Sequence, residues 1–202
     1  AMVLFYFGCM FEVLLTTLGV AERFVTIRRE RDRVRNEADL LERLSETDPL
    51  TGLLNRRAIE RQFEQLREVG FTALAVIDLD HFKAINDGYG HSTGDEVLKA
   101  VAVALKAGSN VRAYRLGGEE FILLLRGRDV DAQAEFRRQA IPATVANAVP
   151  DLAGPVTASM GITAISGVDA FTTVYERADK HLYEAKIAGR NRTRSELGPT
   201  HS

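Results

Sequence analysis

The stretch Arg115-Leu116-Gly117-Gly118-Glu119-Glu120-Phe121 places two glycines directly before two carboxylates. Short runs of strand-forming residues over 111–114 and 121–125 flank the glycines, so the sequence predicts a β-hairpin that turns at this glycine pair. Because glycine has no Cβ, a phosphate chain and its metal ions could come close to the backbone of such a turn. The stretch therefore predicts two antiparallel strands and, between them, a site for an anionic ligand.

A second acidic segment, Asp78-Leu79-Asp80-His81-Phe82-Lys83, follows an apolar run over 71–79 that reads as a strand. Hard divalent cations take oxygen ligands, and acidic side chains from two turns could supply them together. By itself, the pair Asp78 and Asp80 would be interpreted as solubilising residues at a strand end. The glycine-rich turn makes a metal site the better interpretation, with Asp78 and the Leu79 carbonyl as the expected ligands.

The region that starts near Asp48 alternates helical and strand patterns. Helices interleaved with mostly antiparallel strands predict an α+β fold in which helices pack on a sheet. The further elements that we expect are helices over 96–106, 131–148 and 168–188, the last stopped by Gly189, and a strand over 156–165.

The N-terminal segment is strongly apolar, since residues 2–21 contain Glu12 as their single charge. About 20 such residues can span a bilayer. Six arginines follow between residues 23 and 35, and the positive-inside rule assigns that flank to the cytoplasm. The alternative is a helix buried in a soluble dimer, which Glu12 favours. The segment also resembles the last membrane helix of seven-helix signalling receptors, and the start at Ala1 suggests a fragment.

Residues 20–47 contain neither Gly nor Pro and predict one continuous helix. An apolar position recurs every seven residues, as in one seam of a coiled coil. This seam consists of Val20, Ile27, Val34 and Leu41. The second seam includes Arg31 and Ser45 and is poor, so we expect a short, marginal coil. A solvated charged helix without a partner is the alternative.

Composition disfavours several classes of function. The net charge of −2 and the pI of about 6.1 give no basic field of the kind that nucleic-acid binding needs. Cys9 is the only cysteine, which excludes an intrachain disulfide and a CxxC metal site. The four histidines are scattered without the spacing of zinc ligands. We therefore expect neither a nucleic-acid partner nor a structural zinc site.

Cationic and polar residues complete the predicted site. Lys186 and Arg190 lie four residues apart on one face of the last predicted helix, and with Lys83 they are candidate ligands for phosphate. Asp95 could accept hydrogen bonds from N1–H and the N2 amino group of guanine, a donor pair that adenine lacks. Asn86 could contact the same base edge. Taken singly, each would be an ordinary surface polar group.

The region 48–192 resembles the GGDEF family of diguanylate cyclases, and six motifs carry this resemblance in the order of the family. They are Asp48-Pro49-Leu50-Thr51-Gly52-Leu53-Leu54-Asn55-Arg56-Arg57, Asp78 to Asp87, Gly90-His91 with Gly94-Asp95, Arg115 to Phe121, Ser159-Met160-Gly161-Ile162, and Ala178-Asp179 through Leu182-Tyr183-Lys186 to Gly189-Arg190-Asn191. The signature has Glu119 where the family name has Asp, and both acids occur in active members.

The resemblance implies a ferredoxin-like βαββαβ core, similar to nucleotidyl cyclase and polymerase palm domains, here preceded by the long helix. Members condense two GTP into cyclic di-GMP and two pyrophosphates with Mg²⁺ or Mn²⁺. One domain holds one GTP, so a homodimer is required. The implied catalytic residues are Glu119 and Glu120, either of which could be the base. The implied metal ligands are Asp78, the Leu79 carbonyl, Glu119 and Glu120. The implied substrate-binding residues are Phe82, Lys83, Asn86, Asp95, Gly117, Gly118, Lys186 and Arg190.

One departure from the family concerns product inhibition. Many members carry an inhibitory Arg-x-x-Asp site just before the signature, but the aligned residues here are Gly108 and Val111. Neither a guanidinium nor a carboxylate is available to pair with guanine. We therefore expect no inhibitory site.

The sequence thus predicts four segments and one main hypothesis. The segments are an apolar transmembrane or buried helix over 1–21, a coiled-coil signalling helix over 22–47, a GGDEF catalytic domain over 48–194 and a disordered tail over 195–202. The hypothesis is a diguanylate cyclase at the cell inner membrane with its catalytic domain in the cytoplasm. The alternatives are a non-catalytic GTP-binding module, a cyclic di-GMP receptor and a hybrid cyclase that also accepts ATP. The intact acids argue against the non-catalytic module, and the absence of Arg-x-x-Asp argues against the receptor. The presence of Asp95 argues against the hybrid cyclase.

Overall fold

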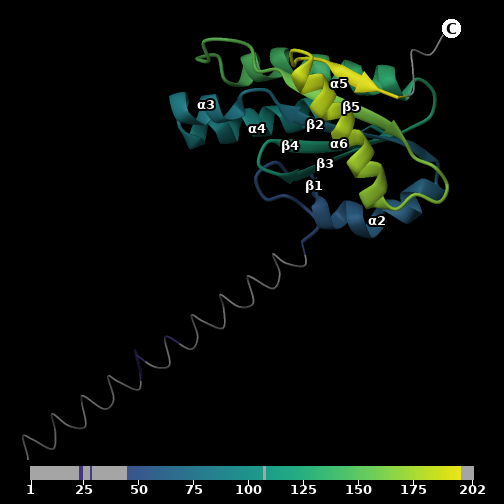
Figure 1. Ribbon diagram of the computed structural model, residues 1–202. Coiled ribbons are helices and arrows are strands. Elements are labelled where there is room, and N and C mark those ends of the chain that lie inside the picture. Colours follow the sequence, from purple (N-terminus) through teal and green to yellow (C-terminus); the bar gives the residue numbers. More distant parts are fainter. Residues whose placement is uncertain (1–22, 25–27, 29–44, 107, 197–202) are drawn as a thin grey trace, which may run out of the picture. The chain divides into compact units, whose positions relative to one another are not determined.

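The computed structural model describes residues 23–24, 28, 45–106 and 108–196, and it divides the chain into two units, 1–45 and 46–202 (Figure 1). Of the first unit, Arg23, Phe24 and Arg28 are helical. The predicted apolar helix and almost all of the predicted coiled coil lie outside the described residues, so both stay predictions. The helix predicted over 20–47 is wrong at its end, because residues 45–47 are not helical and Thr47 forms an antiparallel bridge with Leu54. Among the helices that are described, none combines the length and the hydrophobicity that a membrane crossing needs.

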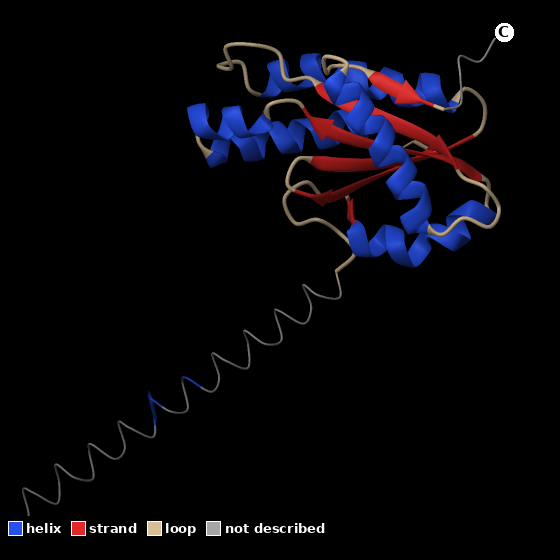
Figure 2. Ribbon diagram, in the orientation of Figure 1, coloured by secondary structure: helices blue, strands red, loops and turns tan. Residues whose placement is uncertain are grey.

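Within the described residues of the second unit, six strands form one mixed sheet in the order β1-β3-β4-β2-β5-β6 (Figure 2). The central strand β2 pairs antiparallel with β4 and with β5, whereas the edge strands β1 and β6 pair parallel with β3 and β5. The strands are β1 (Leu54–Asn55), β2 (Phe71–Leu79), β3 (Val111–Gly117), β4 (Glu120–Arg126), β5 (Ala158–Ala164) and β6 (Thr193–Ser195).

The helices complete a ferredoxin-like core, as the sequence predicted. The order β2, α4, β3, β4, α5, β5 is βαββαβ, and the four strands of this core lie in the order β3-β4-β2-β5. Two further helices, α2 and α6, precede and follow the core. The helices are α2 (Arg56–Glu68), α3 (Phe82–Tyr89), α4 (His91–Leu105), α5 (Val130–Ala148) and α6 (Phe171–Ile187).

Both faces of β2 are buried, each under a different set of helices (Figure 1). Ala73, Ala75 and Ile77 pack with residues of α4 and α5, while Leu74 and Val76 pack with residues of α2 and α6. Successive side chains of a strand alternate between faces, so Asp78 is directed to the α2 and α6 face. A strand covered on both sides reads as a continuous apolar run, which is why its bounds could be predicted.

Several predicted boundaries differ from the structure. The strand over 71–79 and the hairpin are confirmed, but the helix predicted over 96–106 begins at His91. Gly94 therefore lies inside α4, where its missing Cβ leaves room for Asn86 of α3. A glycine usually lies at a helix end, and the close packing of two helices leaves no local signal, so the helix was predicted to begin after Gly94. β6 reaches Ser195, one residue past the predicted end of the domain.

The side chain of Arg115 connects the start of the domain to the glycine turn. Its Nη1 donates to both carboxylate oxygens of Asp48 at 3.0 and 3.1 Å, while Nε and Nη2 donate to the Gly118 carbonyl at 3.1 and 2.8 Å. Thr51 also donates to Asp48 through its backbone N–H and its hydroxyl. Burial alone would raise the pKa of Asp48, but the hydrogen bonds from Thr51 and the pair with Arg115 lower it below its ordinary value.

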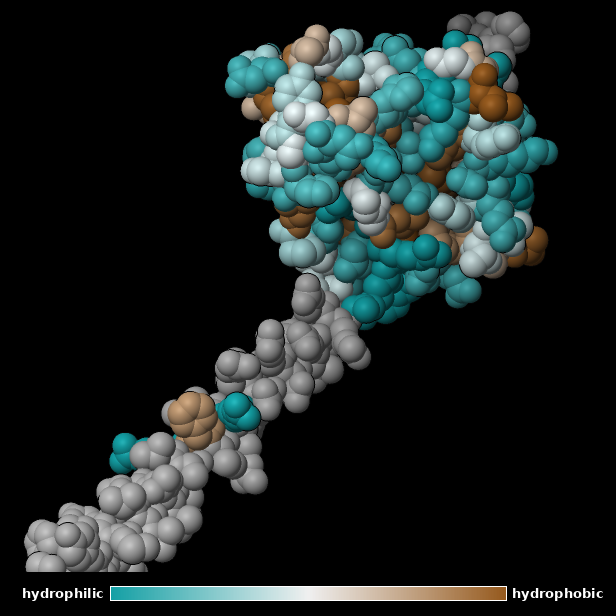
Figure 3. Space-filling model, turned by 60° about the vertical axis from the view of Figure 1, so that its left-hand side comes forward, coloured by the Kyte–Doolittle hydropathy of each residue, from teal (hydrophilic) through white to brown (hydrophobic). Residues whose placement is uncertain are grey.

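The surface of the domain is mixed in polarity. The face in Figure 3 is mostly hydrophilic, and its hydrophobic areas are separated from one another. The most exposed large apolar residues of the described part of this unit lie on α4, on α5, in the loop before α6 and, two of them, on α6 itself. They include Val103, Phe136, Val168, Tyr183 and Ile187.

We predict that Gly161→Ala destabilises the domain. A Cβ at this position of β5 would lie 2.1 Å from the Ala178 carbonyl oxygen and 2.2 Å from the Leu182 nitrogen, so α6 would have to move. Overpacking of this kind costs about 1–3 kcal/mol. The measurement is the free energy of unfolding in urea. Gly167→Ala is the control, because no described heavy atom lies within 4 Å of its added Cβ; equal stability of the two variants would contradict the prediction.

We predict that Asp48→Asn loses a pH-dependent part of the stability. The folded pKa of Asp48 lies below its ordinary value of 3.8. Ionised Asp48 therefore contributes stability that is present above that value and is lost as the pH falls through the folded pKa. In urea unfolding, the variant should be less stable than wild type at neutral pH, and the difference should shrink below about pH 4. A pH-independent difference, or none, would refute this; Asp151→Asn, at an exposed position, is the control.

Candidate active site

Strands β2 and β4 bring the predicted acids to one end of the sheet. Asp78 and Glu120 are direct partners across the two strands. Glu119 lies in the turn before β4, and its carbonyl oxygen accepts a hydrogen bond from the Leu79 N–H at 3.4 Å. Burial and the neighbouring Asp78 charge raise the pKa of Glu119, and Lys186 partly opposes them. The structure thus assembles Asp78, Leu79 and Glu119.

Lys186 reaches this acidic pair from α6. Its Nζ lies 2.8 Å from Oδ1 of Asp78, and both side chains are largely buried. The sequence predicted Lys186 as a phosphate ligand, whereas the structure without ligand has it paired with the predicted metal ligand. The Lys186 ammonium group therefore occupies the place beside Asp78 that a metal ion would need.

Glu120 has a different partner, although it lies opposite Asp78. The Tyr175 hydroxyl of α6 donates to Oε1 of Glu120 at 2.6 Å. In the part of the chain that the structure describes, no three His, Cys, Asp or Glu side chains are arranged to hold a metal ion. The backbones of the predicted acids are therefore adjacent, but Glu120 has its own hydrogen-bond partner on α6.

The glycines and the start of α3 leave backbone groups accessible at this end. Gly117 and Gly118 have φ of 149° and 51° and are exposed. The ring of Phe82 is buried in the core, with 4% of its surface exposed, so a ligand could meet its backbone N–H rather than its side chain. The exposed Lys83 follows in the first turn of α3, where free N–H groups favour anions.

Asn86 and Asp95 are brought together by the packing of α3 on α4. A Cβ at Gly94 would lie 2.0 Å from Oδ1 of Asn86, so the Asn86 amide lies directly against the residue before Asp95. Asp95 itself is exposed. The two residues that the sequence predicted as guanine ligands therefore lie on neighbouring helices and next to one another.

Arg190 follows α6 in a loop of unusual backbone geometry. Arg190 and Asn191 have positive φ values of 61° and 45°, a region that side chains other than glycine rarely adopt. The Asn191 N–H donates to Oδ2 of Asp80 at 3.0 Å, and Arg138 donates to Oδ1 of Asn191 at 2.7 Å. The buried Asp80 thus anchors this loop, in agreement with the choice of Asp78 alone as metal ligand. Its other partners are the hydroxyls of Thr157 and Ser159.

Sequence reasoning missed Tyr175 and Arg138. Tyr175 precedes Lys186 by eleven residues, about three helical turns, so the two share a face of α6 and a helical projection could have found it. Arg138 gave no such signal, because its partners Ala158 and Asn191 are distant in sequence. Both residues act through contacts that only the packed helices create.

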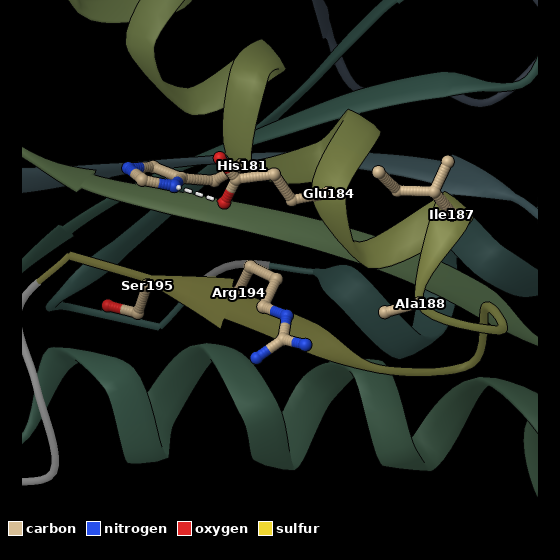
Figure 4. Close-up of a pocket in the computed structure, with 6 residues that line it drawn as sticks. All are labelled: His181, Glu184, Ile187, Ala188, Arg194 and Ser195. Atoms are coloured by element: carbon tan, nitrogen blue, oxygen red, sulfur yellow. Dashed lines mark hydrogen bonds and ion pairs between the residues drawn. The ribbon is translucent and has the colours of Figure 1, made fainter.

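An open groove lies away from these residues, between α6 and β6 (Figure 4). His181 and Glu184 point toward one another there, with Nδ1 and Oε2 3.3 Å apart. None of the predicted site residues lines it. Its lining residues are His181, Glu184, Ile187, Ala188, Arg194 and Ser195.

The positions aligned with the family's inhibitory site are not suited to bind guanine. Gly108 is exposed and has no side chain, and Val111 is 1% exposed at the start of β3. The side chain at position 111 therefore contributes to the core.

Comparisons with known proteins agree with the fold. The family described as "Diguanylate cyclase, GGDEF domain" matches residues 45–192. Diguanylate cyclase DgcP of Pseudomonas aeruginosa is 43% identical over 155 residues, which cover 72% of this chain and 23% of that protein. Diguanylate cyclase VdcA of Vibrio cholerae is 39% identical over 153 residues, which cover 72% of this chain and 45% of that protein. The chain thus spans less than half the length of these two relatives.

A solved structure is also similar. It is the coiled coil and GGDEF domain of DgcB from Caulobacter crescentus in complex with c-di-GMP, with a TM-score of 0.66 and 30% sequence identity. The match covers 87% of this chain and 98% of that one. Because the family model matches most of this chain, the chain belongs to the GGDEF-domain family of diguanylate cyclases.

Proposed function

We propose that this domain is a diguanylate cyclase that condenses two GTP into cyclic di-GMP and two pyrophosphates. The observation that supports this most is the pair Asp78 and Glu119 beside the Gly117–Gly118 turn, within reach of Lys186. Two carboxylates, a bare turn and a cation suit the binding of a triphosphate with its metal ion. The relatives carry the same activity in their names, and the family membership of this chain agrees with it.

The residues present fit Mg²⁺ or Mn²⁺. The donors at the strand ends are all oxygens, as these hard ions require, and Lys186 already neutralises Asp78 in the structure. Asp78, Glu119 and the Leu79 carbonyl would hold the ion, with Glu120 as a further ligand. A bound cation would neutralise the phosphate charge and lower the pKa of the attacking 3′-hydroxyl.

The remaining residues have roles in this proposal that follow from their positions. Lys186, once released from Asp78, and Arg190 bind the triphosphate together with Lys83 and the N–H groups at the start of α3. Asn86 and Asp95 orient guanine. Glu119, whose pKa is raised by burial and by Asp78, is the candidate proton acceptor for the attacking hydroxyl.

We also propose that the active species is a homodimer. Each domain offers one set of these residues, and two GTP must face one another for the reaction. The predicted coiled coil over 22–47 would bring two domains together. Attachment of residues 2–21 to the inner membrane, with the catalytic domain in the cytoplasm, stays a prediction from sequence.

We predict that Glu119→Gln lowers turnover by about 10²–10³-fold while the domain stays folded. The amide keeps the shape of the side chain but loses the charge that binds a cation or accepts a proton. The measurement is incubation with GTP and Mg²⁺ across a range of protein concentrations, with the products separated by chromatography. Glu64→Gln on the exposed side of α2 is the matched control.

The same assay separates the competing hypotheses. Turnover of Glu119→Gln within twofold of wild type would show that the active site is assigned wrongly. A wild-type protein that binds GTP but forms no cyclic di-GMP would support a non-catalytic module. Products from ATP would support the hybrid cyclase. Specific activity that rises with protein concentration is expected for a dimer.

We predict that micromolar cyclic di-GMP does not inhibit the enzyme noncompetitively, because Gly108 and Val111 offer no groups that pair with guanine. The initial rate at saturating GTP should be unchanged by added product, and calorimetry should detect only weak binding that GTP competes away. Inhibition that persists at saturating GTP, together with tight product binding, would mean that another surface has taken over this role.

A further inference from the structure

The two acids that face one another across the sheet have partners at distant points of the same helix. Asp78 and Glu120 are opposite one another on β2 and β4, so both side chains leave the sheet on the α6 side. Asp78 contacts Lys186 at 2.8 Å, whereas Glu120 accepts from Tyr175 at 2.6 Å. Tyr175 and Lys186 are eleven residues apart, about 16 Å along the helix axis. The two carboxylates therefore have separate partners, and among the described residues no three His, Cys, Asp or Glu side chains form a group that could hold a metal ion.

The surroundings of Tyr175 favour this arrangement. The phenol of Tyr175 is an O–H donor, and its oxygen lies 2.6 Å from Oε1 of Glu120. Arg56 of α2 is near both partners, and the pKa of Arg56 is raised mainly by its hydrogen bond to Glu60 and to a smaller extent by Tyr175 and Glu120. The Glu120 carboxylate thus has the Tyr175 hydroxyl as its hydrogen-bond donor, while the Arg56 guanidinium is paired with Glu60.

We propose that Tyr175 is a positioning residue that holds Glu120 away from Asp78 and Glu119, and that a divalent cation must break this hydrogen bond to gain Glu120 as a ligand. The inference rests on the proposed function in taking a divalent cation as the ligand of this site. The Tyr175–Glu120 hydrogen bond stabilises the metal-free state and lowers the affinity for the cation by the same free energy. Tyr175 thereby sets the cation concentration at which the site fills.

The test uses Tyr175→Phe, which removes the hydroxyl and keeps the ring. The probe is Mn²⁺, titrated into the full chain and followed by electron paramagnetic resonance, with and without a GTP analogue that cannot be cleaved. We expect Mn²⁺ to bind about three- to tenfold more tightly to the variant than to wild type, because a hydrogen bond to a charged group no longer competes. Tyr183→Phe is the matched control, since Tyr183 lies on the same helix and is 65% exposed.

A second variant distinguishes this role from a structural one. In a Glu120→Gln background, Tyr175→Phe should leave the Mn²⁺ affinity unchanged, since the residue acts through the carboxylate that is no longer there. Unchanged or weaker Mn²⁺ binding by Tyr175→Phe alone would overturn the proposal. An equal gain in both backgrounds would overturn it too, because the effect would then not pass through Glu120.

The outcome separates this proposal from the proposed function. If wild type binds Mn²⁺ and forms cyclic di-GMP while Tyr175→Phe binds Mn²⁺ no more tightly, the role of Tyr175 is refuted and the cyclase activity stands. If Tyr175→Phe binds Mn²⁺ more tightly but no variant forms product, the role of Tyr175 stands and the activity is refuted. If even wild type binds no Mn²⁺, with or without the analogue, both the role of Tyr175 and the metal requirement of the proposed function are wrong.

Discussion

The pairing of β2 with two neighbours is the constraint on which the rest of this domain depends. β2 bonds to β4 on one side and to β5 on the other, and helices bury both of its faces. Such a strand can hardly shift its register, because a slip of one residue would exchange its two apolar faces and break two ladders. Asp78 therefore stands at a determined place, opposite Glu120 and next to the turn that carries Glu119. The packing of the core thus determines where Asp78, Glu119 and Glu120 lie.

Helix α6 is the second determinant, because it supplies partners to both acids. It approaches β5 so closely at Gly161 that the backbone of Ala178 and Leu182 fills the space of a side chain. This close approach sets the height of α6 above the sheet and thus the reach of Tyr175 and Lys186. From this one helix, the Lys186 ammonium group pairs with the Asp78 carboxylate and the Tyr175 hydroxyl donates to the Glu120 carboxylate.

Two carboxylates, Asp48 and Asp80, anchor the loops around the site. Arg115 ties the glycine turn to Asp48, and Asp80 ties the segment after α6 to the end of β2. Removing one partner of such an anchor would leave the other charge partly buried without compensation, which is costly. The loop after α6 can therefore hold Arg190 and Asn191 at positive φ, which residues other than glycine rarely adopt.

Much of this domain was determined by local sequence. The continuous apolar run gave β2 its bounds, the glycine pair between strand formers gave the hairpin, and the order of the motifs gave the βαββαβ core. The identity of the candidate site was equally local, since Asp78, Glu119, Asn86, Asp95 and Lys186 all stand in recognisable motifs. Residue type and short spacing carry such information because strand pleating and turn geometry depend on near neighbours.

Tertiary structure alone decided which of these groups face one another. The start of α4 at His91 depends on the contact of Gly94 with Asn86, and the anchoring role of Asp80 depends on Thr157, Ser159 and Asn191. The hydrogen-bond partner of Glu120 is Tyr175, a residue that no motif singled out. These contacts join segments that are far apart in the chain, and their geometry is set by how closely helices pack on the sheet. The sequence shows which chemical groups are available, but the distances between them are set only when the core packs.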